Sequence, residues 1–310
     1  MTTVELGSPD RADAPGLVHA WLIACRPATL PAAVAPVLVG TAMAAFRGVM
    51  EVLPAAAAMA GALLIQVGTN LANDYFDDRT GADAEDRVGP TRVVQAGILP
   101  AEAVLRATAL ALGLATVVGA YLVWVGGLPI LVIGVLSLIL AVAYTGGPFP
   151  LAYHGLGDPF VLVFFGLVAV GGTFWVQAGR LDPDLLLAGT GVGALTTAIL
   201  VVNNLRDIRS DERVGKRTLA VRLGPGATKI EFLFLVLLAA AVPPLGVWVA
   251  RWPAWTLLAL FGLGPALRTV DTLFTYREPS ELNAALGEVA RGVTWYGGLL
   301  AVGFVLGSYL

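Results

Sequence analysis

The chain has 310 residues, of which 57% are hydrophobic and 13% charged, and its formal net charge is −3. Soluble domains carry about 25% charged residues, so this composition excludes an ordinary soluble fold and indicates an all-α polytopic membrane protein. The single cysteine, Cys25, excludes an intrachain disulfide, the two histidines have no metal-site spacing, and the small net charge gives no indication of a nucleic-acid partner.

Residues 1–20 are polar, contain Pro and Asp, and lack the pattern of a cleaved signal peptide, so we expect a short disordered tail there. A spanning helix needs about 20 mainly apolar residues. The remaining sequence, 21–310, therefore predicts one domain, a bundle of nine transmembrane helices. The expected spans are residues 28–46, 53–76, 103–124, 127–145, 157–178, 185–206, 230–250, 253–275 and 289–309. Short connections are expected at 125–127 and 180–184.

The distribution of basic residues gives this bundle an orientation. With the N-terminus in the cytoplasm and alternating spans, 16 of the 19 Lys and Arg residues lie on the cytoplasmic side. Only Arg47, Arg180 and Arg251 lie on the other side. Because cytoplasmic loops of membrane proteins carry an excess of Lys and Arg, the positive-inside rule supports the nine spans and this orientation.

The second expected span ends in "NLANDYFDD", residues 70–78, which is unusually acidic for such a hydrophobic chain. At 100° per residue, Asn70, Asp74 and Asp77 fall within about 60° of one helix face, and Asp78 widens that arc to about 100°. One face therefore presents an amide and three carboxylates at the cytoplasmic end of the span.

A second acidic segment, "NNLRDIRSD" (203–211), ends the sixth expected span on the same side. Asn203, Asp207 and Asp211 repeat the spacing of Asn70, Asp74 and Asp78. Each segment precedes a basic loop that contains Gly, "DRVGPTR" (86–92) or "ERVGKRT" (212–218). This pattern predicts an internal repeat, with halves of about 21–145 and 157–310 facing a common cytoplasmic cavity.

Carboxylates near a membrane are costly to bury, at about 2.5–3.5 kcal/mol each at the helix centre, so the two acidic faces need an explanation. Solvated helix ends are one interpretation, and the ion pathway of a transporter is another. A third is a Mg²⁺–diphosphate site, because Mg²⁺ takes oxygen ligands and is usually held by one or two carboxylates plus substrate phosphates. The neighbouring Arg and Lys residues would bind the remaining phosphate charge, which favours this third interpretation.

These motifs resemble those of the UbiA-type intramembrane aromatic prenyltransferases, in which an NxxxDxxxD segment and a DxxxD segment lie in the two halves of nine transmembrane helices. Further stretches are most similar to the 1,4-dihydroxy-2-naphthoate polyprenyltransferases of bacteria, which make demethylmenaquinone. They are "NDYFDDRTGADAEDRVGPTRVVQAG" (73–97), "YTGGPFPLAYHGLGD" (144–158), "FFGLVAVGGTFWVQ" (164–177) and "NNLRDIRSDERVGKRTLAVRLG" (203–224). The resemblance implies transfer of a polyprenyl group from its diphosphate, with loss of CO₂, in the bacterial plasma membrane. Prenyltransferases acting on 4-hydroxybenzoate or homogentisate are the nearest alternatives.

The resemblance also implies roles for individual residues. Two Mg²⁺ ions would be bound by amide and carboxylate side chains of both segments, namely Asn70, Asn73, Asp74, Asp77, Asp78, Asn203, Asp207 and Asp211. Asp74, Asp77, Asp207 and Asp211 would be catalytic, and Asp77 is the candidate for a base that accepts a phenolic proton. Diphosphate would be bound by four cations: Arg26, Arg92, Lys216 and Arg217.

The loop between the fourth and fifth spans is the expected entrance for the aromatic acceptor. Tyr144, Tyr153 and His154 are the candidate acceptor-binding residues there. Aromatic rings could also shield an allylic cation by cation–π contact, and the candidates are Phe149, Tyr153, Phe174 and Trp175. Packing against lipid or at the interface is the alternative for each of these rings. The prenyl chain length and the oligomeric state are left open.

Overall fold

The structure is a computed structural model, and it describes residues 15–80, 88–89 and 91–309. Within these ranges the chain forms only helices, turns and loops, which confirms the all-α prediction. The α-helices are α1 (Leu17–Cys25), α2 (Pro31–Phe46), α3 (Val52–Thr80), α4 (Ala101–Gly126), α5 (Leu128–Ala143), α6 (Gly157–Val161), α7 (Ala169–Ala178), α8 (Asp184–Arg213), α9 (Leu219–Val249), α10 (Gly264–Thr275) and α11 (Leu282–Gly307). The other helical turns are η2 (Pro27–Thr29), η3 (Leu151–His154), η4 (Leu162–Val168), η5 (Ala254–Leu263) and η6 (Pro279–Glu281).

Seven of the described helical segments are long and apolar enough to cross a membrane, and an eighth crosses if the bent pair Leu17–Thr29 and Pro31–Phe46 is one span. Helix α5 is apolar too, but it is shorter, at 16 residues. The predicted count of nine is therefore not confirmed, although each of the nine expected segments overlaps a helix. The largest difference in bounds is at α9, which begins at Leu219 and not at 230, and which is kinked at Gly224 (φ 79°).

The N-terminal helix bends sharply before it enters the bundle. Arg26 follows α1 in the left-handed conformation (φ 50°), and Pro27 and Pro31 then start η2 and α2. Proline fits the first turn of a helix but not its interior, so the two prolines favour a new helix start at each position. The resulting bend is 52°. Helix α1 begins at Leu17, so residues 17–20 are helical and not part of a disordered tail as expected; residues 1–14 lie outside the described ranges.

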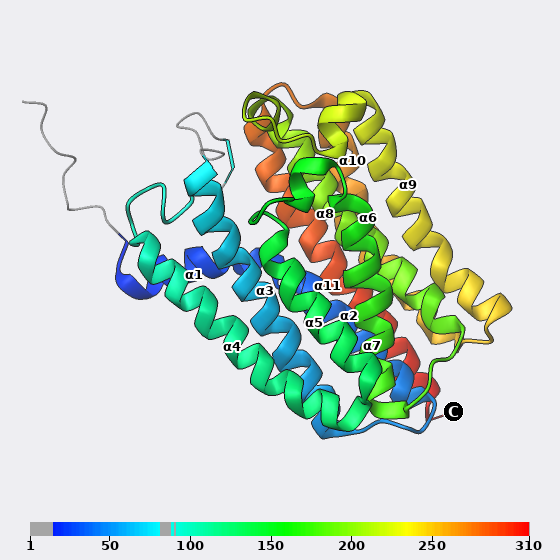
Figure 1. The fold of residues 1–310 in the computed structure, drawn as a ribbon. Coiled ribbons are helices and arrows are strands. Elements are labelled where there is room, and N and C mark those ends of the chain that lie inside the picture. The colour runs from blue at the N-terminus through cyan, green and yellow to red at the C-terminus, as the bar shows by residue number, and fades with distance from the viewer. Residues whose placement is uncertain (1–14, 81–87, 90, 310) are drawn as a thin grey trace, which may run out of the picture.

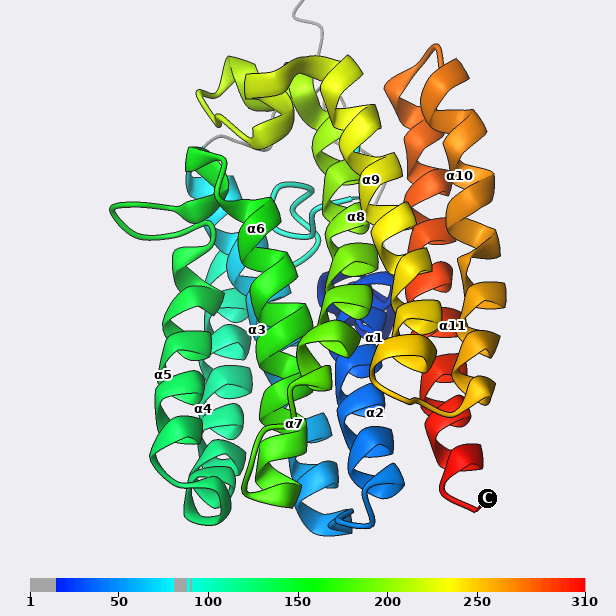
Figure 2. The same ribbon diagram turned by 90° about the vertical axis from the view of Figure 1, so that its right-hand side faces the viewer.

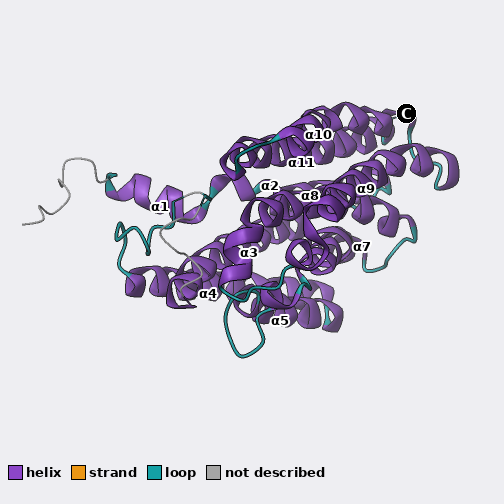
Figure 3. Ribbon diagram, turned by 90° about the horizontal axis from the view of Figure 1, so that it is seen from above, coloured by secondary structure: helices purple, strands orange, loops and turns teal. Residues whose placement is uncertain are grey.

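The helices pack side by side with their long axes roughly aligned (Figures 1 and 2). Helix α8 lies inside the bundle and contacts α9, η4 and α11, while α3 packs against α4 and α11 packs against α2 and η5. Seen from above, α4 and α5 lie on one flank and α10 on the opposite flank (Figure 3). This arrangement buries most of α8 and leaves one side of α4 and α5 exposed, as expected for a helix facing lipid.

The segment that precedes α7 approaches α8 very closely. A side chain at Gly166 of η4 would place its Cβ 2.4 Å from the Gly189 carbonyl oxygen and 2.8 Å from the Gly193 Cα. Small residues at such crossings let membrane helices pack backbone to backbone. Residues 162–168 form a π-helical turn, a feature often found at functional sites. The turn brings Phe164 and Phe165 into the wall of one cavity.

Candidate active site

The first acidic segment lies in about the last three turns of α3, where it holds the following loop. Arg92 Nη2 donates to Asp77 Oδ2 at 2.6 Å, and neither side chain is more than 8% exposed. Asp74 Oδ2 accepts a bond from the Val93 backbone N–H at 3.2 Å. Val93 itself is completely buried. Asp74 and Val93 therefore anchor the chain that presents Arg92 to Asp77.

The two amides of this segment orient its surroundings. Asn70 Nδ2 donates to the Cys25 carbonyl at 2.9 Å and to Thr29 Oγ1 at 2.8 Å, so it joins α3 to the bend between α1 and α2. Asn73 Oδ1 accepts a bond from Thr145 Oγ1 at 2.7 Å. Both amides also line the cavity. Asp78 is half-buried and does not line it.

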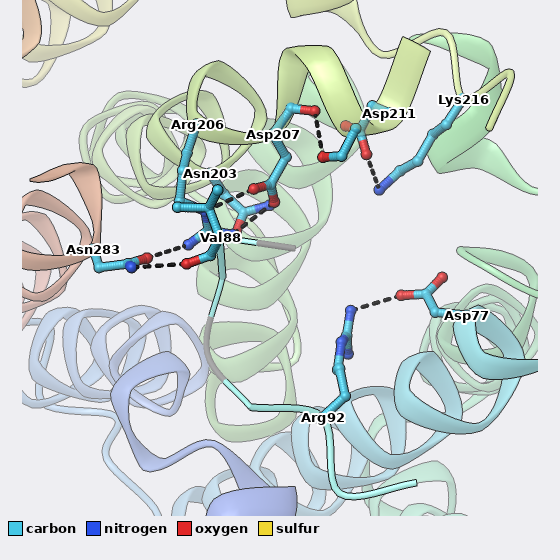
Figure 4. A network of polar contacts seen from close by, with 10 residues as sticks. Asp77, Val88, Arg92, Asn203, Arg206, Asp207, Asp211, Lys216 and Asn283 are labelled. Atoms are coloured by element: carbon cyan, nitrogen blue, oxygen red, sulfur yellow. Dashed lines mark hydrogen bonds and ion pairs between the residues drawn. The ribbon is translucent and has the colours of Figure 1, made fainter. Parts of the chain in front are cut away.

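The second acidic segment is organised by Arg206, a residue that the sequence analysis did not single out. Its guanidinium donates from Nε and Nη2 to the two Asp207 oxygens, at 2.7 and 2.6 Å, and from Nη2 to Asn203 Oδ1 at 2.8 Å. Its Nη1 donates to Asn283 Oδ1 at 2.9 Å, and Asn283 Nδ2 donates to the Val88 carbonyl at 2.9 Å (Figure 4). Asn283 therefore connects α8, the start of α11 and the loop that follows the first segment.

Asp211 pairs with Lys216 across 3.3 Å (Figure 4). Its other oxygen, Oδ2, is buried and has no hydrogen-bond partner among the described residues. Burial alone would lower the pKa of Lys216, but the carboxylates of Asp211, Asp77 and Asp207 together raise it above its ordinary value. The lysine is therefore a cation that interacts with acids from both segments.

The two segments lie at one end of a cavity of about 1000 Å³, as the sequence repeat predicted. Ten predicted site residues line it: Arg26, Asn70, Asn73, Asp77, Arg92, Tyr144, Asn203, Asp207, Asp211 and Lys216. Five others do not line it: Asp74, Asp78, Tyr153, His154 and Arg217. Of these, Arg217 is exposed, and its backbone N–H donates to the Tyr153 carbonyl at 3.1 Å. Three residues of the first basic loop, Asp86, Arg87 and Pro90, lie outside the described ranges.

The aromatic residues in the cavity are mostly different from those expected. Phe174 is completely buried in the core, and Trp175 lies outside the cavity with its indole N–H bonded to the Gly126 carbonyl at 2.8 Å. Phe149 is 55% exposed and stacks on His154, with ring centroids 3.6 Å apart. Packing therefore accounts for these rings. The aromatic residues that line the cavity are Tyr144, Phe160, Phe164 and Phe165.

Sequence reasoning also missed polar residues in the cavity wall. Arg206 lies inside the second acidic segment, and Asn283 lies in "LNAAL" (282–286), a stretch without obvious chemistry. Asp158 ends the stretch "HGLGD" and is buried in the wall. The stretches quoted for the family resemblance contain both Arg206 and Asp158, but only Arg206 also lies inside an acidic motif, where a basic residue is a natural partner.

Carboxylate and amide oxygens are the ligands that a hard cation such as Mg²⁺ prefers. The described carboxylates do not, however, form a complete metal site by themselves. In the described part of the chain, no three His, Cys, Asp or Glu side chains lie close enough to hold a metal ion by themselves. Mg²⁺ is usually bound by one or two carboxylates plus substrate phosphates, and it keeps several waters. The unbonded Asp211 oxygen and the cavity-lining Asp77 carboxylate, one from each segment, fit that mode.

The chain matches a known protein family over most of its length. A model of the UbiA prenyltransferase family matches residues 33–307. The chain belongs to this family. The resemblance inferred from the acidic motifs is thereby confirmed, and the chain is a member of a prenyltransferase family with helices of membrane-spanning length.

Several curated UbiA-family relatives bear the same name. A 1,4-dihydroxy-2-naphthoate octaprenyltransferase of Escherichia coli is 46% identical over 212 residues, which cover 66% of this chain and 69% of the relative. A protein of the same name from Haemophilus influenzae is 36% identical over 301 residues, which cover 93% and 96% of the two chains.

Solved structures of UbiA homologues share the fold at low sequence identity. A homologue from Aeropyrum pernix superimposes with a TM-score of 0.64 at 16% identity, covering 94% of this chain and 98% of that one. A homologue from Archaeoglobus fulgidus, bound to DMAPP and Mg²⁺, gives a TM-score of 0.63 at 12% identity, with 91% and 99% covered.

Proposed function

We propose that this protein transfers a polyprenyl group from polyprenyl diphosphate to 1,4-dihydroxy-2-naphthoate, with loss of CO₂ and diphosphate, in a Mg²⁺-dependent reaction of menaquinone biosynthesis. The observation that carries the proposal is the cavity. Acids from both halves and the cations Arg92 and Lys216 lie at one end of it, and the rest of the wall is largely apolar. The shared name of relatives up to 46% identical supports the choice of acceptor.

The charged end of the cavity suits a diphosphate. When bound by Asp77 and Asp211, with Asn73 and Asn203 nearby, Mg²⁺ would neutralise part of the charge that develops on the leaving diphosphate. Arg92 and Lys216 would bind phosphate oxygens directly, since charge-assisted bonds from fixed cations stabilise such charge best away from water. Asp74 would serve the same end indirectly by anchoring Val93 beside Arg92.

The apolar part of the cavity suits the prenyl chain and the reactive carbon. Phe160, Phe164 and Phe165 would exclude water from an allylic cation and interact with it through their ring faces. The position of the acids at the ends of α3 and α8, and not at the helix centres, favours a substrate headgroup over an ion pathway through the membrane. By the positive-inside rule, this end would face the cytoplasm of a bacterial plasma membrane.

The test is an acceptor panel with purified protein in detergent. Radiolabelled polyprenyl diphosphate is offered with 1,4-dihydroxy-2-naphthoate, 4-hydroxybenzoate or homogentisate, and products are identified by mass. We expect product with the naphthoate only, and none in EDTA. The thermal unfolding midpoint should not change in EDTA, because Arg92, Arg206 and Lys216 already pair with the cavity acids.

Asp77→Asn and Asp211→Asn should each lower kcat/KM by about 100-fold or more, as expected when a charge that holds metal and phosphate is removed. Asp271→Asn, an exposed position on α10, is the matched control and should not change it. Prenylation that persists without divalent metal would refute the metal-dependent mechanism. Product with 4-hydroxybenzoate alone would reassign the acceptor.

A further inference from the structure

Asp158 is a buried carboxylate in the cavity wall that no part of the proposed mechanism uses. It is the second residue of α6 and is only 4% exposed. Asp77, Asp207 and Asp211 each pair with an Arg or Lys side chain. By contrast, the Asp158 carboxylate accepts a hydrogen bond from its own backbone N–H and has no hydrogen-bond or ion-pair partner on any other residue in the described ranges. Since a buried carboxylate is costly unless it is paired, a ligand group is the natural partner for it.

Within the cavity wall, Asp158 lies close to the charged end, where the two acidic segments meet. Tyr144, the residue that follows α5, also lines the cavity, and its hydroxyl would be 3.1 Å from a Cβ at Gly157. The negative charges of Asp158, Asp211 and Asp77 all act on the Tyr144 phenol. The Tyr144 phenol is therefore near Asp158 and near an acid from each acidic segment.

Helix α6, which carries Asp158, and the η4 turn that follows it also supply the phenylalanine rings of the cavity wall. Phe160 and Phe164 stack with ring centroids 4.2 Å apart and an interplanar angle of 17°. Both line the cavity with Phe165. A flat aromatic molecule against these rings would have a carboxylate acceptor at its polar edge.

We propose that the new bond forms at C2 of the acceptor, the attacked carbon, which carries the carboxylate, and that Asp158 accepts a hydrogen bond from the adjacent C1 hydroxyl and takes its proton as the new carbon–carbon bond forms. The inference rests on the proposed function. It assigns the base to Asp158 and not to Asp77, the earlier candidate, whose carboxylate is already engaged by Arg92 at 2.6 Å.

The proton and electron transfers balance without another reagent. A ring π pair forms the bond to the allylic carbon, the hydroxyl O–H pair becomes the C=O π bond, and the proton moves to the Asp158 carboxylate. When the bond to CO₂ breaks, its electron pair restores the ring and the oxygen regains negative charge. Asp158 then returns the proton to that oxygen, so the carboxylate is regenerated.

The test combines the Asp158→Asn variant with two acceptor analogues used as inhibitors. 1-Hydroxy-2-naphthoate keeps the hydroxyl next to the attacked carbon, and 4-hydroxy-2-naphthoate lacks it. In the wild type, the first should inhibit about tenfold more strongly, because hydrogen bonds to charged groups are strong. In Asp158→Asn this preference should fall to within about twofold, and kcat should fall about 100-fold, as for loss of a general base. The KM for polyprenyl diphosphate should not change.

Asp158→Glu, which keeps the charge, should retain the preference and recover part of kcat, and it provides the comparison if the Asn variant is not monodisperse. Asp271→Asn should behave as the wild type in every assay. A kcat within threefold of wild type in Asp158→Asn, or an undiminished preference between the analogues, would overturn the inference while leaving the proposed function intact. If the wild type prenylates no naphthoate in the acceptor panel, the proposed function itself fails.

Discussion

At the scale of single residues, three acids of the two acidic segments that line the polar end of the cavity are each neutralised by a nearby cation. Asp77 pairs with Arg92, Asp207 with Arg206 and Asp211 with Lys216, all with side chains no more than 16% exposed. Removing one member of a buried pair leaves an uncompensated charge and typically costs about 3–5 kcal/mol, far more than breaking an exposed pair. We therefore expect these pairs to influence stability and, under the proposed function, substrate binding as well.

Arg92→Leu tests this dual role. The variant should lower the free energy of unfolding by about 3 kcal/mol, because Asp77 loses its partner. It should also raise the KM for polyprenyl diphosphate at least tenfold. Chemical denaturation in detergent and steady-state kinetics measure the two effects. Arg291→Leu is the control, since Arg291 is 64% exposed and lies on α11, and it should change neither quantity. An unchanged KM in Arg92→Leu would contradict a role in diphosphate binding.

A site residue could be predicted from the sequence when the residues related to it lie within a few helical turns. It could not be predicted when its contacts are distant in the sequence. The i, i+4, i+8 spacing placed Asp74 and Asp78 on one face of their helix, and Asp207 and Asp211 on one face of theirs, because helix geometry alone fixes that relation. The alternation of apolar spans then put both faces at the same end of the bundle. The bond between Arg206 and Asn283 joins residues 77 positions apart, so no local pattern contains it. Asp158 was missed for the same reason. A single Asp at the start of an expected span has no periodic acidic neighbours, and its burial follows only from the packing of α6 against α8.

At the scale of elements, the contact between η4 and α8 sets the position of the aromatic cavity wall. Gly166, Gly189 and Gly193 meet with backbone atoms in contact. The π-helical turn could not be predicted, because apolar periodicity distinguishes a helix from a strand but not a π-turn from an α-turn. The approximate positions of the apolar helices were predictable from their hydrophobicity, although the count of nine spans is not confirmed.

Gly166→Ala should disturb this contact. The new Cβ would lie 2.4 Å from the Gly189 carbonyl oxygen, so the two helices must separate, at a cost of about 1–3 kcal/mol. Displacement of Phe164 and Phe165 should also lower kcat. Gly113→Ala on α4 is the matched control, because its Cβ would meet nothing within 4 Å. The control should be neutral or stabilising. Equal thermal midpoints for the two variants would contradict the close packing.

At the scale of the whole molecule, the cavity extends through most of a membrane's thickness. On α3 it is lined from Asp77 near the polar end to Ala58 near the other. These residues are 19 positions apart, which corresponds to about 28 Å along a helix and is close to the roughly 30 Å of a bilayer's hydrocarbon core. A long prenyl chain could therefore lie along α3 with its diphosphate at Asp77.

Ala58→Trp should shorten the prenyl chain that the enzyme accepts. The indole would block the far end of the cavity, so kcat/KM for a long polyprenyl diphosphate should fall at least about tenfold, while that for geranyl diphosphate is unchanged. Ala56→Trp, at an exposed position on the same helix, is the control. Competition between the two diphosphates, followed by mass analysis of the products, measures the ratio. A ratio equal to that of the wild type would show that the chain takes another route.

The bridge made by Asn283 has a practical consequence for engineering. Because Asn283 at the start of α11 contacts both Arg206 and the Val88 carbonyl, this helix contributes to the polar end of the cavity and is not only an outer support. Its other end, near Gly307, lies at the opposite end of the bundle (Figure 2). Affinity tags or reporter fusions attached there should leave turnover intact, whereas insertions near residue 280 should inactivate the protein.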